Sequence, residues 1–423
     1  MDAKRLENTL MAINQFGYSD KGMTRLAYSE IERQAVEHFA GLCRQAGMTV
    51  CIDASGNLIA RREGRHPDWP AVAVGSHLDT VIQGGGYDGA LGVVAALEVI
   101  YSMNDGQIET DHPVEIIAFA CEESSRFGVS TVGSKAMAGI LDKEKLSGLT
   151  DRDGRSMAEA FSDCGLDFES VEQSARGRGE LKAFFELHIE QGPVLENEGL
   201  QIGLATGIAA PSRYEVHIQG HASHSGTTPM NGRHDAFLGA AELSLELEKA
   251  AKLEVAYGTV ATVGVCEVKP GAMNVVPDAA ELKLEIRGTS VESKNRVVDR
   301  LFAAIEEAKS TRGLQITFRQ LSNEMPVHLD SEVIESLSRL CAQEGFSYRR
   351  MPSGAGHDAM NMALLCPTGL IFVPSKDGVS HHRDEFTSVE QLAAGAILLE
   401  QAILQWAGAS SSQQEVYRTE RVL

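Results

Sequence analysis

The first 200 residues alternate between short apolar runs and helical patterns, and this alternation constrains the fold more than any other feature of the chain. Residues 71–75 and 114–120 have the composition of buried strands, and the apolar run 91–100 follows a glycine-rich turn as a buried helix. A helical pattern at 30–46 and a strand pattern at 184–188 extend the series. Strands and helices in alternation are typical of an α/β domain, and we expect a mixed sheet flanked by helices.

The pattern changes near residue 210, where an α+β unit is predicted. Its elements are a strand at 213–219, a helix at 233–252, strands at 258–268 and 280–288, a helix at 292–309 and a strand at 314–320. The order β-α-β-β-α-β matches the ferredoxin-like split motif. A chain of 423 residues is also too long for one ordinary core. We therefore expect residues 210–326 to form an inserted lid or dimerisation domain.

The catalytic domain is then expected to comprise residues 1–209 and 327–423. A strand at 369–373 and a helix at 389–407 return the chain to the first pattern. The polar segment 410–414 is expected to be a mobile tail.

Charge and cysteine usage exclude several classes of function. A formal net charge of −21 argues against nucleic acid or an anionic membrane as a partner. The seven cysteines are scattered and never spaced as CxxC, which fits reduced thiols in a cytosol. No signal-like segment and no run of membrane-spanning length is present, so a cytoplasmic protein is expected. An anionic small-molecule substrate would need a local arginine or metal cluster.

Five short segments, far apart in the chain, each offer a metal ligand beside a glycine or at a strand end. They are Ser76–Asp79, Tyr87–Gly89, Cys121–Ser124, Glu186–His188 and Ser380–His382. Any one of them alone is ordinarily a surface carboxylate or a hydrogen-bonded histidine, but together they favour a metal site. Three imidazoles and two carboxylates suit two divalent ions such as zinc, and a pair of such ions mainly activates water. The pattern therefore predicts a hydrolase.

The local spacing suggests different roles for these residues. His77 and Asp79 are two apart on a predicted strand and face the same side, so the Asp79 carboxylate could accept the second ring N–H of His77. Asp88 follows a glycine-rich turn, where a short carboxylate could bridge two ions. Glu122 and Glu123 point in different directions, so one can bind metal while the other moves protons.

Longer motifs accompany these ligands. They include Gly75–Thr80, Glu186–Pro193 (ELHIEQGP), His224–Met230, Asn274–Pro277, Ser353–Asp358 and Gly378–His381. With these motifs, nearly the whole chain resembles the dinuclear zinc amidohydrolases of the aminoacylase and carboxypeptidase-G-like metallopeptidase superfamily. It is most similar to the ureido-hydrolase branch, which contains N-carbamoyl-L-amino acid hydrolases, allantoate amidohydrolases and β-ureidopropionases.

The resemblance assigns metal ligands residue by residue: Asp88 as the bridge, His77 and His188 on one ion, and Glu123 and His381 on the other. The family pattern Gly-Ile/Val-Ser-His favours His381 over its neighbour His382. Glu122 matches the general base, and Cys121, where the peptidase branches usually carry aspartate, is interpreted as a core residue. Zinc is the first choice of metal, and manganese, cobalt and nickel also suit such ligands.

The resemblance also implies substrate contacts. Arg287 matches an arginine that grips a substrate carboxylate, although a strand-end arginine is ordinarily solvent-facing. Asn274 matches an asparagine that orients the substrate, and His224 a histidine that reaches the partner's site in a homodimer formed through the lid domain. His357 matches a loop that lines the site. Some ureido hydrolases have an arginine near the position of Arg213, but the residues around Arg213 do not align clearly with theirs, so the role of Arg213 stays open.

The expected reaction is hydrolysis of the ureido C–N bond of an N-carbamoyl-L-amino acid, giving the amino acid, CO2 and ammonia. Allantoate is the second choice of substrate, and a dipeptidase or N-acyl-amino-acid deacylase the third. A non-catalytic binding protein would have lost the base or a ligand, whereas Glu122 and all five ligands are present.

Overall fold

The computed structural model describes residues 1–409; the predicted tail at 410–414 lies outside the described residues. The chain divides into two compact units. The first comprises Met1–Thr206, Leu329–Met351 and His357–Leu423, and the second comprises Gly207–His328 and Pro352–Gly356. Within the described part of the chain, no helix is both long and apolar enough to cross a membrane.

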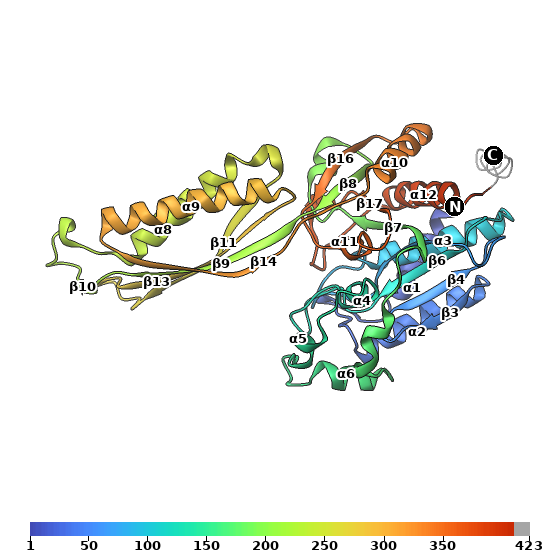
Figure 1. The fold of residues 1–423 in the computed structure, drawn as a ribbon, viewed down its shortest axis with the longest axis horizontal. Coiled ribbons are helices and arrows are strands. Elements are labelled where there is room, and N and C mark those ends of the chain that lie inside the picture. Colours follow the sequence, from blue (N-terminus) through green and yellow to red (C-terminus); the bar gives the residue numbers. More distant parts are fainter. Residues whose placement is uncertain (410–423) are drawn as a thin grey trace. The chain divides into compact units, whose positions relative to one another are not determined.

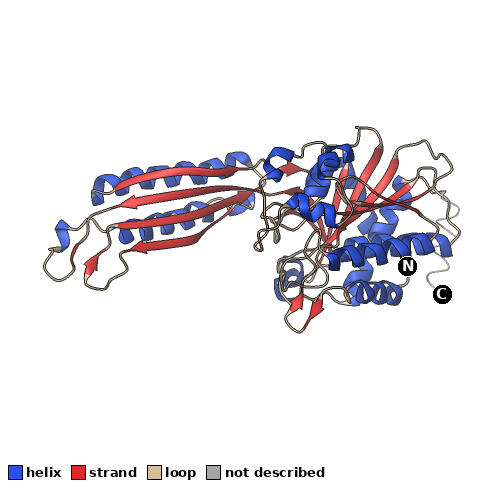
Figure 2. Ribbon diagram, turned by 90° about the horizontal axis from the view of Figure 1, so that it is seen from below, coloured by secondary structure: helices blue, strands red, loops and turns tan. Residues whose placement is uncertain are grey.

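The first unit is built around a mixed sheet (Figures 1 and 2). Its strands, in spatial order, are β8 (Ile202–Ile208), β17 (Thr368–Val373), β7 (Leu181–Ile189), β5 (Ala71–His77), β6 (Val114–Phe119), β4 (Leu58–Arg62) and β3 (Thr49–Ile52), with β16 (Tyr348–Ser353) also pairing with β8. The short strand β15 (Val327–His328) belongs to the second unit and pairs with Gly207 and Ile208, the two residues of β8 that also belong to that unit. The central strands β17, β7, β5 and β6 are parallel, whereas β8, β4 and β3 are antiparallel to their neighbours. Strands β5, β6 and β17 are buried throughout, as parallel strands covered on both faces should be.

Helices cover this sheet. The longer ones are α1 (Ala3–Ile13), α2 (Glu30–Gln45), α3 (Ala90–Asp105), α10 (Ser331–Glu344) and α12 (Val389–Trp406), and the shorter ones are α4 (Val132–Met137), α5 (Lys143–Ser147), α6 (Met157–Asp163), α7 (Val194–Glu198) and α11 (Ala359–Met362). Helix α3 is apolar on nearly all sides because it packs against both the sheet and the helices α1 and α12. Helix α12 begins with a capping box between Ser388 and Gln391.

The second unit contains a four-stranded antiparallel sheet. Its strands, in spatial order, are β11 (Val260–Lys269), β13 (Ala279–Gly288), β9 (Ala210–Gln219) and β14 (Gln315–Asn323). Helices α8 (Ala236–Lys252) and α9 (Val291–Arg312) lie on one face of this sheet and share an apolar core with it (Figure 1). The opposite face carries charged side chains, because the strands alternate between the two faces.

Short elements complete the described chain. They are β1 (Tyr18–Ser19), β2 (Gly22–Met23), β10 (Ser223–His224), β12 (Val275–Val276) and the 3-10 turns Phe168–Ser174, Met230–Gly232, Val255–Tyr257 and Lys376–Gly378. The predicted fold class is confirmed in both units: a mixed sheet flanked by helices, and a separate four-stranded antiparallel sheet with the predicted β-α-β-β-α-β order. The function of the second unit as a lid or dimerisation domain stays a prediction.

The parallel strands bring the predicted ligand segments together. His77 is the last residue of β5, Glu122 and Glu123 follow β6, and His188 lies one residue before the end of β7. The strand registers pair His77 with the end of β6, and place His188 beside β17. Since parallel strands end at the same edge of a sheet, these side chains meet there.

Candidate metal centre

Asp88 lies at the middle of a compact group of histidines and carboxylates. Its Oδ1 atom is 3.3 Å from Nε2 of His77 and 3.1 Å from Nε2 of His188. Its Oδ2 atom is 3.2 Å from Nε2 of His381, which is in turn 3.4 Å from Oε1 of Glu123. The side chains thus form two groups of three, His77–Asp88–His188 and Asp88–Glu123–His381, that share Asp88.

The donor chemistry of this group fits two divalent cations. Imidazole nitrogens and carboxylate oxygens are the ligands that zinc and similar ions prefer. The two oxygens of Asp88 face different groups, as a bridging carboxylate requires. Asp88, Glu122 and Glu123 are all buried, and buried carboxylates need a compensating positive charge. Metal binding by the predicted ligands is therefore chemically consistent with the site and stays a prediction.

Backbone carbonyls fix the orientation of two histidine rings. Nδ1 of His77 is 3.0 Å from the backbone oxygen of Asp79, and Nδ1 of His188 is 2.9 Å from that of Ile189. A ring whose Nδ1–H donates to a carbonyl carries its lone pair on Nε2, the atom that faces Asp88 in both histidines. Gly89 makes room for this arrangement: its φ is +64°, and a Cβ there would lie 2.4 Å from the His77 ring.

The position of Asp79 differs from the sequence-based expectation. Its carboxylate is 3.6 Å from Nδ1 of His77 and instead accepts two backbone N–H groups, from Glu122 at 3.2 Å and from Glu123 at 3.0 Å. The reason is that β5 ends at His77, so the two-residue alternation of a strand no longer applies at Asp79. The Asp79 side chain thus fixes the backbone of Glu122 and Glu123, while its backbone oxygen orients the His77 ring.

Glu122 has the environment of a group that handles protons. Its Oε2 atom is 3.8 Å from Nε2 of His77. Burial raises the pKa of Glu122 well above its ordinary value; the nearby His77 opposes this, and the Glu123 and Asp358 carboxylates add to it. A buried carboxyl group with a raised pKa is suited to general acid–base work. Cys121, which precedes it, is fully buried in an apolar cluster with Tyr28, as a core residue should be.

His381 forms the accessible side of the centre. Its side chain is 50% exposed, whereas those of His77 and His188 are buried. The hydrogen bond with Asp88 raises the pKa of His381 to about 9, against the effect of burial and with support from Glu123. The neighbouring His382 is turned toward Asp384 instead, at 3.5 Å, so the structure places His381 rather than His382 in the group.

Three residues of the centre were missed by sequence reasoning. Gln191 donates to Oδ2 of Asp88 at 2.7 Å, and the Ser380 hydroxyl is 3.2 Å from the same oxygen. Oε1 of Glu385 accepts the backbone N–H groups of Tyr87 and Asp88, at 2.9 and 3.0 Å. Gln191 and Ser380 lie inside the motifs Glu186–Pro193 and Gly378–His381 and could have been found there. Glu385 lies in no motif, and nothing in the sequence distinguishes it from a surface glutamate.

The predicted loop residue His357 lies against the centre. Its ring is buried, and its centroid is 4.5 Å from that of His188 in an edge-to-face arrangement. Burial and the neighbouring His188 lower the pKa of His357 well below its ordinary value, so the ring is neutral. The next residue, Asp358, accepts the Ser134 hydroxyl at 2.5 Å.

The other predicted substrate contacts belong to the second unit. His224 and Asn274 are brought together there, because β10 pairs with β12 and the Ser225 N–H donates to the Asn274 carbonyl at 3.0 Å. Arg213 and Arg287 lie on the charged face of the sheet and both contact Glu285. The roles of these residues toward substrate stay predictions.

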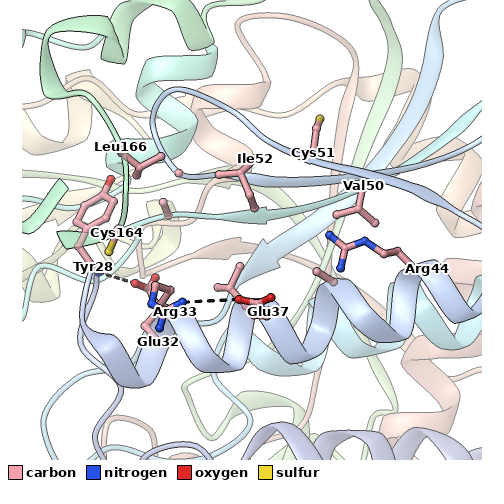
Figure 3. Close-up of a pocket in the computed structure, with 14 residues that line it drawn as sticks. Tyr28, Glu32, Arg33, Glu37, Arg44, Val50, Cys51, Ile52, Cys164 and Leu166 are labelled. Carbon is pink, nitrogen blue, oxygen red and sulfur yellow. Dashed lines mark hydrogen bonds and ion pairs between the residues drawn. The ribbon is translucent and has the colours of Figure 1, made fainter. Parts of the chain in front are cut away.

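Two hollows of the first unit differ in their relation to the centre. One of about 520 Å³ includes Tyr87 and Glu385 in its lining and so adjoins the segment that carries Asp88. The other, of about 290 Å³, lies between α2 and β3 and is lined by Val36, Val50 and other residues that include none of the metal-ligand candidates (Figure 3). The chemistry of the site thus favours the surroundings of Asp88 over the second hollow.

Comparison with known proteins places this geometry in a family. Residues 73–405 match the family model described as peptidase family M20/M25/M40. A protein of Haemophilus influenzae named "Uncharacterized hydrolase" is 45% identical over 96% of this chain and 99% of its own length. The N-carbamoyl-L-amino acid amidohydrolase of Geobacillus stearothermophilus is 41% identical over 96% of this chain and 99% of its own.

A further relative and a solved structure match along nearly their whole length. The allantoate amidohydrolase of Escherichia coli is 34% identical over 92% of this chain and 94% of its own. The crystal structure of an amidase of the hydantoinase/carbamoylase family from Burkholderia multivorans superposes with a TM-score of 0.90, at 34% identity, and covers 96% of this chain and 98% of that chain. The chain therefore belongs to peptidase family M20/M25/M40, in its branch of hydantoinase/carbamoylase amidohydrolases, and is a metal-dependent hydrolase of C–N bonds.

Proposed function

We propose that the protein hydrolyses the ureido C–N bond of an N-carbamoyl-L-amino acid, releasing the amino acid, CO2 and ammonia. The observation that carries this proposal is the 41% identity, along nearly the whole chain, to an N-carbamoyl-L-amino acid amidohydrolase. The buried Glu122 beside the paired ligand groups around Asp88 supplies the chemistry that such a reaction needs.

Five residues would hold the two divalent ions: His77 and His188 one, Glu123 and His381 the other, and Asp88 both. Zinc is the first choice, and manganese, cobalt and nickel suit the same donors. When bound, such ions polarise a substrate carbonyl and lower the pKa of water.

Glu122 is the proposed general base and acid. It takes a proton from the attacking water at its carboxylate and passes that proton to the leaving nitrogen, so the carboxylate is regenerated after each turnover. Burial supports this role because it stabilises the protonated intermediate form of Glu122 relative to the charged one. The two backbone hydrogen bonds to Asp79 support it further by limiting the movement of the segment that carries Glu122.

The substrate contacts are proposed from the family resemblance. Arg287 and Asn274 would bind the carboxylate end of the substrate, and His357 would line the site. His224 would stabilise the developing oxyanion in the partner subunit of a homodimer. An arginine suits the first role because its planar fork can bind a carboxylate through two hydrogen bonds.

The proposed function is tested by ammonia release from the metal-reconstituted protein. N-carbamoyl-L-amino acids and allantoate are compared side by side, with Glu122→Gln as the control. Turnover of N-carbamoyl-L-amino acids that is lost in Glu122→Gln supports both the bond and the base. If neither substrate releases ammonia although metal is bound, the assignment changes to a dipeptidase or an N-acyl-amino-acid deacylase.

Allantoate is the second candidate substrate, favoured by the 34% identity to an allantoate amidohydrolase. Allantoate carries a ureido group and a carboxylate on the same carbon, as an N-carbamoyl amino acid does, so the same contacts would serve both. Faster turnover of allantoate in the comparison above would select it.

A further inference from the structure

Glu285 contacts both Arg213 and Arg287, the two candidate substrate-binding arginines of the second unit. Strands β9 and β13 are antiparallel, with Glu285 directly opposite Arg213, and Arg287 follows two residues later on the same face. Oε2 of Glu285 accepts from Nε of Arg213 at 2.8 Å, and Oε1 accepts from Nε of Arg287 at 3.1 Å. One carboxylate therefore binds two guanidinium groups through its two oxygens.

Arg287 has a second fixed contact. Its Nη1 atom donates to the backbone oxygen of Gly354 at 2.7 Å, and Gly354 belongs to the segment Pro352–Gly356 of the same unit. A guanidinium group has five N–H donors, and these two contacts use one on Nε and one on Nη1. Within residues 1–409, no hydrogen bond to Nη2 of Arg287 is found. One N–H of Nη1 and both of Nη2 are left, and terminal N–H groups on these two nitrogens can bind a carboxylate end-on.

We infer that Glu285 is a positioning residue for the substrate carboxylate. It fixes the plane of the Arg287 guanidinium and leaves the terminal N–H groups free, while Arg213 neutralises Glu285 and does not itself bind substrate. The inference rests on the proposed function, in which Arg287 holds the carboxylate end of an N-carbamoyl-L-amino acid. It assigns the open role of Arg213 and adds a residue that the family resemblance did not supply.

The charges of the three side chains explain why Arg213 is needed. Glu285 alone would cancel the charge of Arg287, and Arg213 returns the group to a net charge of +1. The side chains of Arg213, Glu285 and Arg287 are 49%, 31% and 26% exposed, so solvent screens their longer-range effects. Geometry should then outweigh net charge: loss of Glu285 weakens carboxylate binding although it makes the site more positive.

The same sheet face offers a matched control. Glu281 lies four residues before Glu285 on β13 and pairs with Lys283 at 3.3 Å and with His217 at 3.6 Å. It is thus a carboxylate of the same charged face that does not contact Arg287. If Glu285 only contributes to the ion pairs of this face, Glu281→Gln and Glu285→Gln should change KM by the same factor.

The test measures KM and kcat for the N-carbamoyl-L-amino acid that the wild type hydrolyses fastest. Glu285→Gln is expected to raise KM about tenfold and to change kcat by no more than about twofold. The variant loses the charge-assisted hydrogen bond between Glu285 and Arg287, which affects substrate binding and not the chemical step. Arg213→Gln is expected to raise KM as well, since Glu285 then neutralises Arg287. Glu281→Gln should leave both constants unchanged.

A binding measurement separates this inference from the proposed function. In the Glu122→Gln background, calorimetry compares the same N-carbamoyl-L-amino acid with its primary amide, which lacks the carboxylate. The preference for the acid should shrink about tenfold on adding Glu285→Gln and persist with Glu281→Gln. If the double variant Glu122→Gln/Glu285→Gln keeps the full preference for the acid over the amide, the positioning role of Glu285 is overturned and the proposed function is untouched. If Glu122→Gln itself shows no preference for the acid, both the proposed role of Arg287 and the positioning role of Glu285 are overturned.

A second variant controls for an effect of the substitution on folding. Glu285→Asp keeps the charge but withdraws the carboxylate by one methylene group, and it should also raise KM. A KM that is unchanged or lower in both Glu285 variants, with wild-type melting temperatures, would contradict the positioning role.

Discussion

At the scale of single residues, the centre depends on side chains that hold the backbone of the ligands. Glu385 accepts the N–H groups of Tyr87 and Asp88 with one oxygen, and its other oxygen is 3.2 Å from the Ser380 hydroxyl. It thereby joins the segment of Asp88 to the segment of His381. Partners of this kind set the geometry of ligands without touching the metal themselves.

We expect Glu385→Gln to lower the affinity for the metal by about tenfold to a hundredfold. A neutral amide weakens the two N–H contacts and turns one acceptor into a donor, so Asp88 loses its fixed orientation. Titration of the metal-free protein with zinc checks the expectation. The neighbouring Asp384, whose side chain is 69% exposed, offers the control Asp384→Asn. Equal affinities in both variants would show that Glu385 does not position Asp88.

Gly89→Ala is expected to destabilise the protein by about 3 kcal/mol or more and to abolish activity. The added Cβ would lie 2.4 Å from the His77 ring, and the φ of +64° is one that alanine rarely adopts. Urea-induced unfolding measures the stability. In Gly148→Ala the added methyl group meets nothing within 4 Å, and this variant should remain near the wild type. Wild-type stability of Gly89→Ala would contradict the crowded geometry.

At the scale of elements, the sequence predicts most of the fold and part of the site. The buried strands and α2 were predicted within a few residues, because their apolar periodicity is strong. His77, Glu123 and His188 could be expected to converge because parallel strands end at one edge. The hydrogen bonds of Asp79 could not be predicted, since they depend on the residue at which β5 ends. Glu385 and Glu285 act through tertiary and cross-strand contacts that no local pattern reveals.

The second unit contains an ion-pair cluster that should make its stability depend on pH. Glu254 follows α8 and accepts from Arg296 of α9 at 2.9 and 2.6 Å and from the Ser293 hydroxyl at 2.8 Å. The hydrogen bonds from Arg296 lower the pKa of Glu254 to about 2, against a smaller effect of burial. The folded pKa lies below the unfolded one, so this stabilisation is present above pH 4.5 and is lost as the pH falls toward 2.

Glu254→Gln should therefore lower the melting temperature most at neutral pH, and the difference from the wild type should shrink between pH 5 and about pH 3. Thermal unfolding of both proteins across this range gives the measurement. Glu248→Gln, which removes an exposed pair with Lys252, should change little at any pH. A difference between Glu254→Gln and the wild type that stays constant with pH would rule out the ion pair as its source.

At the scale of the whole molecule, the proposed metal ligands are confined to one of the two units. All five belong to the first unit, and they come from segments that end β5, precede α3, follow β6, end β7 and precede α12. A metal that binds these side chains in the folded state stabilises the unit that holds them, by mass action. The second unit has its own apolar core and contains none of the five.

Removal of the metal should thus loosen the first unit selectively. In hydrogen exchange followed by mass spectrometry, the chelated protein should exchange faster than the zinc-loaded protein in peptides containing Asp88, Glu123 and His381, because local opening is no longer opposed by binding. Peptides from β9 and β13 should exchange at the same rate in both states. His188→Ala, which removes a ligand from the buried group, should reduce the difference in the first unit. Equal slowing of exchange in both units by zinc would mean that the metal couples them, and would contradict independent stabilisation of the first unit.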